Sequence, residues 1–205
     1  MIGSVKDSCY GIMIKYPEPG RVKTRLAAGI GTERAVLVYK RLVGRILEQT
    51  APAAGDYERF IFYDPAERAA DFIAWLPHER YILQTGKDVG ERMDNAVRSL
   101  FEKGARKAVI TGADIPDLDS GIIRQAFEML DRSDVVVGPA RDGGYYLIGM
   151  KSPMPELFFN IQWSTGSVFS ETVGRLEQLG RSCGLLPVLS DIDTAEDLNH
   201  ENTVE

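Results

Sequence analysis

The sequence has few of the residues that most often carry metal or nucleophilic chemistry. Its 205 residues include only two cysteines and two histidines. Cys9 and Cys183 are far apart, and neither residue type occurs in pairs with the spacing of a zinc site. This scarcity argues against zinc modules and histidine-based triads. We expect both cysteines to be reduced thiols without a chemical role.

Long apolar runs and an excess of positive charge are also missing. The longest apolar runs, such as 134–139 and 185–189, are much shorter than a membrane span, and the N-terminus has no basic region followed by an apolar core. The formal net charge is -6 at pH 7, whereas nucleic-acid-binding proteins usually carry a broad basic face. We therefore expect a cytoplasmic protein whose partners include neither a membrane nor a nucleic acid.

Short apolar segments alternate with amphipathic ones, which predicts a single α/β domain over residues 1–205. The expected architecture is a three-layer α/β/α sandwich with a mostly parallel sheet. Two adjacent strands without a helix between them, on either side of 138–144, break the alternation and predict a mixed sheet. In chain order, we expect strands at 10–14, 57–63, 81–83, 107–111, 135–137, 145–148 and 185–189, and helices at 32–51, 66–75, 89–103, 120–130, 167–179 and 194–198.

A loop rich in cations follows the first predicted strand. Lys15, Arg21, Lys23 and Arg25 lie within eleven residues, and Gly20 gives the backbone freedom to turn. If the later part of the loop is extended, its three cations share one side. Lysine and arginine are the side chains that bind phosphate oxygens, so a polyphosphate ligand is the first hypothesis. The alternative is a solvated surface turn.

Aspartates occur where a metal could meet such a ligand. Asp114 follows the fourth predicted strand, after Gly112 and Ala113, whose small side chains leave room for a ligand. Asp191 and Asp193 would lie on the same side of an extended segment. Mg²⁺ usually binds only one or two protein carboxylates together with phosphates and water. The alternatives are that Asp114 turns the chain and that Asp193 belongs to a helix N-terminus.

Two further features are candidates for binding an acceptor. Asp142, followed by Gly143 and Gly144, could bind an acceptor hydroxyl or act as a base, but Asp-Gly is also a common hairpin turn. Trp163 is a candidate to shelter a base or a sugar, and core packing is its alternative role.

Together these segments resemble the nucleotide-diphospho-sugar transferase superfamily, which has the glycosyltransferase-A-like (GT-A-like) fold. The similarity covers nearly the whole chain and is greatest to a poorly characterised bacterial branch near the small guanylyl- and cytidylyl-transferring enzymes. The motifs are Lys15-x-Pro17-x-x-Gly20-x-Val22-Lys23-Thr24-Arg25-Leu26, Gly112-Ala113-Asp114-x-Pro116, Gly138-Pro139-Ala140-x-Asp142-Gly143-Gly144-Tyr145-Tyr146 and Asp191-Ile192-Asp193-Thr194-x-Glu196-Asp197-Leu198.

The resemblance implies roles for individual residues. Lys23 and Arg25 would bind the nucleotide phosphates, with Lys15 as a helper, and Asp114 would bind Mg²⁺ or Mn²⁺. Position in the motif favours Asp193 over Asp191 as the second metal ligand. The remaining implied phosphate-loop and strand-end positions are Gly20, Arg21, Thr24, Gly112 and Ala113.

The density of cations in the first loop favours a nucleoside triphosphate as the ligand. The predicted reaction is nucleotidyl transfer to a small phosphorylated acceptor with release of pyrophosphate, in which Lys23, Arg25 and Asp142 take part. Two alternatives stay open, which are glycosyl transfer from a nucleotide-diphospho-sugar and nucleotide binding without catalysis. The first loop lacks the Gly-x-Gly-Thr-Arg form of many pyrophosphorylase relatives. The base preference and the acceptor of those relatives therefore do not carry over to this chain.

Overall fold

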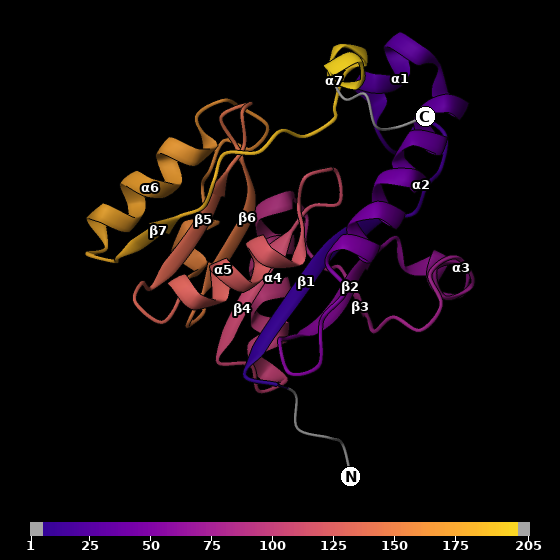
Figure 1. Ribbon diagram of the computed structural model, residues 1–205. Coiled ribbons are helices and arrows are strands. Elements are labelled where there is room, and N and C mark those ends of the chain that lie inside the picture. The colour runs from indigo at the N-terminus through magenta and orange to yellow at the C-terminus, as the bar shows by residue number, and fades with distance from the viewer. Residues whose placement is uncertain (1–5, 201–205) are drawn as a thin grey trace.

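A computed structural model describes residues 6–200, which are built around one seven-stranded sheet in the order β3-β2-β1-β4-β6-β5-β7 (Figure 1). Strand β6 is antiparallel to its neighbours β4 and β5, and the other neighbouring pairs are parallel. The predicted mixed, mostly parallel sheet is therefore confirmed. The strands are β1 (Ser8–Lys15), β2 (Glu58–Asp64), β3 (Tyr81–Leu83), β4 (Lys107–Thr111), β5 (Val135–Pro139), β6 (Tyr145–Met150) and β7 (Cys183–Leu185).

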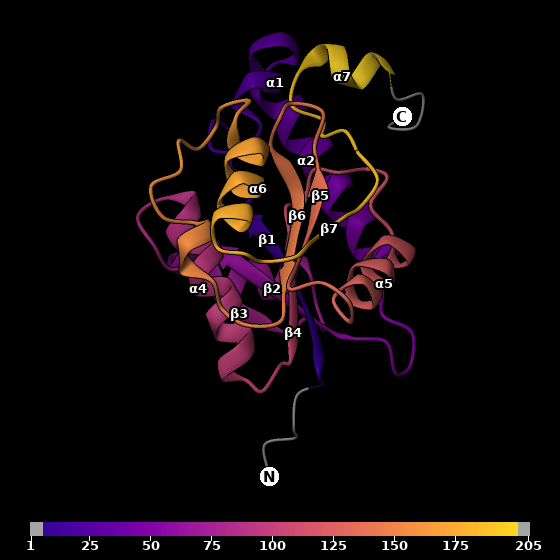
Figure 2. The ribbon, with the colours of Figure 1, turned by 90° about the vertical axis from the view of Figure 1, so that its left-hand side faces the viewer.

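Helices cover both faces of the sheet, which confirms the three-layer arrangement. Figure 2 shows α4 and α6 on one side of the strands and α2 and α5 on the other. No helix of the described residues is long and apolar enough to cross a membrane. The helices are α1 (Thr24–Ile30), α2 (Thr32–Gln49), α3 (Ala69–Trp75), α4 (Val89–Glu102), α5 (Ser120–Met129), α6 (Val168–Gln178) and α7 (Ala195–His200), with short 3-10 turns η1 (Ala66–Arg68) and η2 (Pro155–Leu157).

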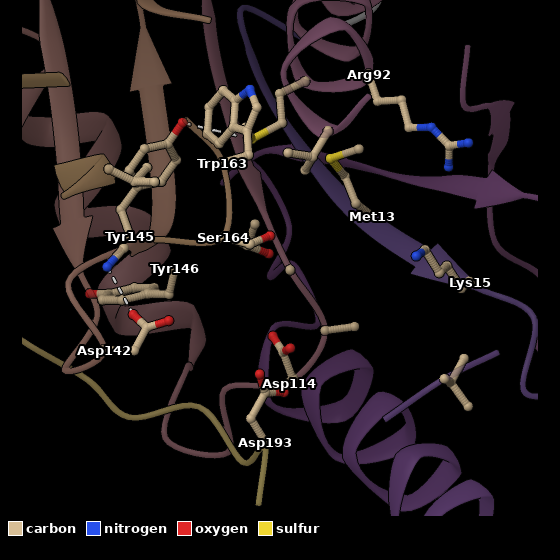
Figure 3. A pocket seen from close by; sticks show the side chains of 18 of the residues that line it. Met13, Lys15, Arg92, Asp114, Asp142, Tyr145, Tyr146, Trp163, Ser164 and Asp193 are labelled. Carbon is tan, nitrogen blue, oxygen red and sulfur yellow. Dashed lines mark hydrogen bonds between the residues drawn. The ribbon is translucent and has the colours of Figure 1, made fainter. Parts of the chain in front are cut away.

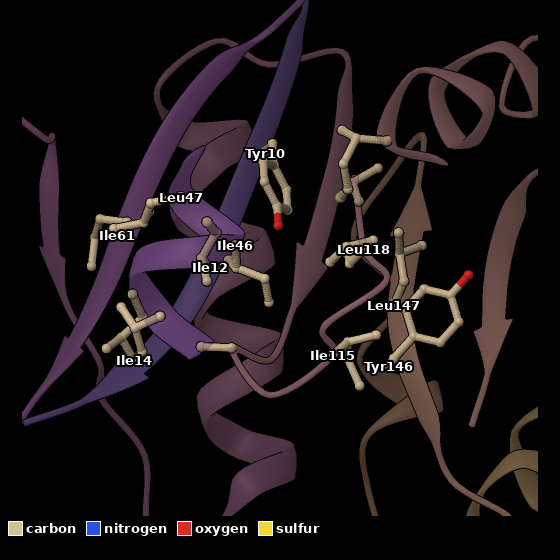
Figure 4. Packing of buried hydrophobic residues seen from close by; sticks show 14 of the residues in the cluster. Tyr10, Ile12, Ile14, Ile46, Leu47, Ile61, Ile115, Leu118, Tyr146 and Leu147 are labelled. Carbon is tan, nitrogen blue, oxygen red and sulfur yellow. The ribbon is translucent and has the colours of Figure 1, made fainter. Parts of the chain in front are cut away.

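The middle residues of the central strands β1 and β4 are mostly apolar, as expected for strands covered on both faces. Along β1, Tyr10, Ile12 and Ile14 pack toward α2, where they meet Ile46 and Leu47 (Figure 4). The alternate β1 side chains belong to a second apolar cluster beneath α4 and α6. This two-sided core holds the carboxyl ends of β1 and β4 side by side.

The C-terminal segment returns to the end of β4 after leaving the sheet. Leu189 pairs with Ala140, and the Ile192 amide donates a 3.1 Å hydrogen bond to the Asp114 carbonyl. Ile192 is buried in a third cluster that includes Leu26 of α1 and Leu42 of α2. The chain thereby brings residues near positions 23, 114 and 193 to one place.

Two local predictions from the sequence are wrong. The cation-rich loop is not extended, because α1 begins at Thr24 and Lys23 adopts a left-handed conformation (φ 48°, ψ 47°). Burial of Leu26 against the third cluster favours the helix over the strand. The last strand is Cys183–Leu185 rather than 185–189, since Pro187 has no N–H to offer a strand ladder.

Predicted helix ends agree with the structure. The Asp88 carboxylate accepts a 2.9 Å hydrogen bond from the Glu91 amide at the start of α4, and Asp119 caps α5 through the Ile122 amide in the same way. Gly104, with φ 104°, follows the end of α4. These caps are local, which is why the sequence alone predicts them.

Candidate functional site

A pocket of about 620 Å³ opens at the carboxyl ends of β1 and β4, which is where parallel sheets bind ligands (Figure 3). Most of the residues singled out in the sequence meet there. Gly20 and Gly143 do not line the pocket formed by the described part of the chain. The predicted site residues that line it are Lys15, Arg21, Lys23, Thr24, Arg25, Gly112, Ala113, Asp114, Asp142, Gly144, Trp163 and Asp193.

Lys23 joins the two predicted metal ligands. Its Nζ lies 3.0 Å from Asp114 Oδ2 and 2.7 Å from Asp193 Oδ1, and its side chain is only 4% exposed. Burial alone would lower the pKa of Lys23, but the charges of Asp114 and Asp193 outweigh burial and raise it. The ammonium group is therefore a fixed positive charge between two carboxylates.

The other cations surround this group without sharing one strand face. Arg25 lies in α1 and is 65% exposed, with Nη1 3.7 Å from Asp193 Oδ2. Arg21 is 67% exposed and pairs with Glu18 at 3.3 Å. Lys15, at the end of β1, is also exposed. Solvent-exposed cations at the mouth of a pocket are available to an anionic ligand.

Carboxylates are in excess at this end of the pocket. The pKa of Asp191 is raised to about 6, first by burial and then by the negative charges of Asp142, Asp193 and Asp114. Asp191 itself does not line the pocket, whereas Asp193 does. Gly112 makes room for Asp114, because a Cβ there would lie 2.8 Å from Asp114 Oδ1.

The donor set fits a hard divalent cation held by few protein ligands. Lys23 contacts one oxygen of Asp114 and one of Asp193, and both carboxylates are about one-third exposed at the pocket (34% and 35%). The described residues contain no group of three or more His, Cys, Asp or Glu that could hold a metal ion. Such a site would rely on ligand phosphates and water for the rest of the coordination.

The turn between β5 and β6 has both a structural and an exposed part. The Gly144 amide donates a 2.8 Å hydrogen bond to Asp142 Oδ1, as in an Asx turn. Gly143 has φ 88°, and a Cβ there would lie 2.2 Å from the Gly166 carbonyl oxygen. Gly143 thus lets the segment that carries Trp163 approach the turn, while Asp142 remains at the pocket.

Tyr145, Met93 and Arg92 line the pocket but were not predicted from the sequence. Tyr145 makes an edge-to-face contact at 6.4 Å with the predicted Trp163, and its hydroxyl donates to Met93 Sδ over 3.8 Å. Arg92 of α4 lines the pocket and pairs with Asp64 at 3.0 Å. From the sequence alone, an apolar strand residue that lines a pocket cannot be distinguished from one that packs in the core. The only usable signal was Tyr145 itself, which directly follows the Asp-Gly-Gly turn.

Gln84 is a second residue that the sequence did not reveal. It is buried at the end of β3, and its Nε2 donates to the carbonyls of Ile14 at 3.2 Å and Phe62 at 2.7 Å. This pairing spans β1 and β2 and fixes a polar amide in the pocket lining. By contrast Cys9 and Cys183 form no disulfide, and burial raises the pKa of Cys9 to about 11.

Comparison with known proteins assigns a family. Residues 47–165 match the family described as an uncharacterized protein conserved in bacteria (DUF2064). The chain belongs to the DUF2064 family. This DUF2064 protein is 36% identical to a solved protein of Desulfovibrio desulfuricans G20 described as a candidate nucleotide-diphospho-sugar transferase, with a TM-score of 0.90 over 96% of this chain and 89% of that one.

More distant structures share the fold of the DUF2064 protein. CMP:2-keto-3-deoxy-manno-octonic acid synthetase complexed with CTP is 12% identical, with a TM-score of 0.60 over 95% of this chain and 96% of that one. Rv0371c from Mycobacterium tuberculosis H37Rv, solved in complex with manganese, is 16% identical, with a TM-score of 0.55 over 94% and 96%. No curated protein matches the chain. The expected nucleotide-diphospho-sugar transferase fold is confirmed.

Proposed function

We propose that the protein is a nucleotidyltransferase that uses a nucleoside triphosphate with Mg²⁺ or Mn²⁺ and a small phosphorylated acceptor. The observation that carries this proposal is Lys23, which is buried between Asp114 and Asp193 in a pocket rimmed by exposed cations. Such an arrangement suits a ligand with many phosphate charges accompanied by a divalent cation. The fold shared with a CTP-bound synthetase is consistent with it.

In this proposal each group has a defined task. Lys15, Arg21, Lys23 and Arg25 bind the triphosphate, and Asp114 and Asp193 would hold the metal, which when bound supplies positive charge to the phosphates. An oxygen of the acceptor phosphate attacks the α-phosphorus, and the bond from that phosphorus to the leaving pyrophosphate breaks. The protein contributes position and charge rather than a covalent intermediate.

The acceptor would approach from the β6 side of the pocket. Asp142 and Trp163 lie there and are the proposed acceptor contacts, together with the backbone of Gly144. Gly143 acts indirectly, because it sets the distance between the β5–β6 turn and Gly166. An acceptor placed at this side faces the phosphates bound at the end of β1.

Glycosyl transfer is the second candidate function. It is favoured by the 36% identical relative, which is described as a candidate nucleotide-diphospho-sugar transferase. In that reaction the same cations would bind a diphosphate, and the bond between the sugar and the phosphate would break without release of pyrophosphate. A non-catalytic nucleotide-binding module would bind nucleotide and turn over neither class of donor.

The test combines binding with product analysis. Thermal melting with the four nucleoside triphosphates and with nucleotide sugars, each with and without Mg²⁺, detects binding because a ligand of the native state raises its stability. Pyrophosphate release with a panel of phosphorylated acceptors supports nucleotidyl transfer, and turnover of nucleotide sugars without pyrophosphate contradicts it. Lys23→Ala should reduce the melting shift at a given nucleotide concentration, whereas Arg106→Ala, which lies just before β4 and pairs with Asp7, should retain it.

A further inference from the structure

The pocket contains an apolar compartment beside its charged end. Figure 3 shows Asp114 and Asp193 at one end and Trp163 and Tyr145 at the other. The floor of this compartment is the sheet surface itself, and its wall comes from α4. The side chains that form it are Met13, Met93, Ile110, Tyr145, Ile148 and Trp163. Aromatic and aliphatic linings of this kind bind ligand groups with little polarity.

One polar atom in this compartment is poorly satisfied. The Tyr145 hydroxyl donates to Met93 Sδ over 3.8 Å, which is a weak hydrogen bond, and no other partner for it lies within residues 6–200. Burial raises the pKa of Tyr145 far above its usual range, so the phenol stays neutral. Its oxygen lone pairs are free to accept a hydrogen bond. The hydroxyl is partly buried at the pocket wall with a thioether as its partner, so a ligand group in the pocket can complete its hydrogen bonding.

Trp163 forms a second wall of the compartment, and its neighbours hold it in place. Ser164 adopts φ 62°, a left-handed conformation that is rare outside glycine and asparagine. Gly90 accommodates the indole, since a Cβ there would lie 2.5 Å from Trp163 Nε1. Gly143 supports the same segment through Gly166. Strained backbone that the surroundings hold in place is typical of ligand sites.

The apolar compartment is poorly suited to a nucleobase. A base presents several donors and acceptors on its edges, and the polar side chains of Gln84 and Arg92 lie at the ends of β1 and β2, where Gln84 bonds the Ile14 and Phe62 carbonyls and Arg92 pairs with Asp64. Around Trp163 the hydroxyls that line the pocket are those of Tyr145, Ser164 and Thr165, and the Thr165 hydroxyl already donates to the Gln162 carbonyl at 2.8 Å. The compartment therefore suits a ring with few polar substituents.

We infer that this compartment binds a flat, largely apolar ring of the acceptor, which stacks on Trp163 and donates one hydrogen bond to the Tyr145 hydroxyl. This inference rests on the proposed function, because it assigns the ring to the acceptor and not to the nucleotide. The acceptor class is then a phosphorylated compound with an aromatic or otherwise planar ring, and a plain sugar phosphate is excluded.

Neutral ring compounds test the compartment without engaging the phosphate site. The probes are 4-hydroxybenzyl alcohol, benzyl alcohol and propane-1,3-diol, and binding is followed through the indole N–H resonance of Trp163, which Trp75→Phe distinguishes from the second indole. We expect both ring compounds to shift this resonance and to bind about tenfold more tightly than the diol. Equal binding of the diol, or no shift at Trp163, would overturn the inference.

Two variants and a competition refine the result. Tyr145→Phe should remove about a fivefold advantage of the hydroxylated ring and leave benzyl alcohol unchanged, since one neutral hydrogen bond is lost. Tyr63→Phe, a tyrosine that packs on Phe72 outside the pocket, is the matched control. Saturation with each nucleoside triphosphate and Mg²⁺ should leave ring binding intact. Competitive displacement would assign the compartment to the base and overturn the inference.

Failure of the proposed function has a different signature. If no nucleotide binds but both ring compounds do, the compartment stands and nucleotidyl transfer is wrong. If triphosphates bind and release pyrophosphate equally well with acceptors that lack a ring, the acceptor inference alone is wrong.

Discussion

At the scale of single residues, Lys23 is where the three segments of the site meet. Its ammonium group neutralises two carboxylates that would otherwise repel each other across the pocket. The same group is the cation most deeply buried near the proposed phosphate site, since Arg21 and Arg25 are two-thirds exposed. Lys23 can therefore hold Asp114 and Asp193 in place before a ligand arrives.

Lys23→Ala should weaken nucleotide binding by about 10- to 100-fold, because one charge-assisted contact with phosphate is lost. It should also lower the free energy of unfolding by about 1–2 kcal/mol, a modest value since the two aspartates are partly exposed. Calorimetric titration and urea unfolding measure these two effects.

Divalent metal provides the control for this variant. Without the ammonium group, Mg²⁺ should stabilise Lys23→Ala more than it stabilises the wild type, because a metal can take over the neutralisation of Asp114 and Asp193. Lys40→Ala, on the exposed face of α2, should behave like the wild type in every assay. If Mg²⁺ stabilises Lys23→Ala and the wild type equally, Asp114 and Asp193 do not bind Mg²⁺.

At the scale of elements, the β5–β6 turn and the Trp163 segment depend on a glycine. Gly143→Ala combines a left-handed φ of 88° with a Cβ that would lie 2.2 Å from Gly166 O. We expect a loss of about 2–3 kcal/mol in the free energy of unfolding and a displaced Trp163, visible in the indole resonance. Gly44→Ala is the matched control, because it lies exposed in α2 with open space around it, and it should stabilise by about 0.5–1 kcal/mol.

The edge of the sheet supplies a prediction for pH. The amide and hydroxyl of Ser182, before β7, donate to Asp134 Oδ2 at 3.0 and 2.8 Å, and these hydrogen bonds hold the pKa of Asp134 below its usual value. A depressed folded-state pKa gives stability that is present above the unfolded pKa and is lost as the pH falls through the folded pKa. Asp134→Asn should therefore cost more stability at pH 7 than at about pH 3.

Urea unfolding at the two pH values measures this effect. Asp117→Asn, at an exposed position before α5, is the control and should show the same small change at both. A pH-independent loss in Asp134→Asn would mean that the Ser182 contact acts through neutral hydrogen bonding alone.

Elements were predictable where the signal was local. Continuous apolar runs identify β1 and β4, and Asp88 and Asp119 mark helix starts, because caps and two-sided burial need no knowledge of the rest of the chain. Helix α1 was missed because Lys23 and Arg25 made its start look like part of a basic loop, and because its packing partner Ile192 lies far away in the sequence. The apolar compartment was missed because Met13 reads as core in a buried strand.

At the scale of the whole molecule, the site forms because the segment around Ile192, near the end of the chain, packs against α1, near its start. Sequence motifs indicate that positions 23, 114 and 193 belong together, and the packing of Ile192 against Leu26, with its 3.1 Å hydrogen bond to the Asp114 carbonyl, helps to bring Asp193 to its place. The geometry of the site is therefore coupled to this contact between distant elements.

Ile192→Ala tests that coupling. We expect a loss of about 2–4 kcal/mol, as for other buried isoleucines, and a larger loss of nucleotide affinity than stability alone explains, since Asp193 is no longer fixed. Leu176→Ala is the matched control: it is equally buried, in α6 on the opposite face of the sheet, and should lose similar stability but keep its affinity. Nucleotide affinity is measured for both variants well below their melting temperatures, so that both are folded. Equal affinities would mean that the C-terminal segment stabilises the fold without positioning the site.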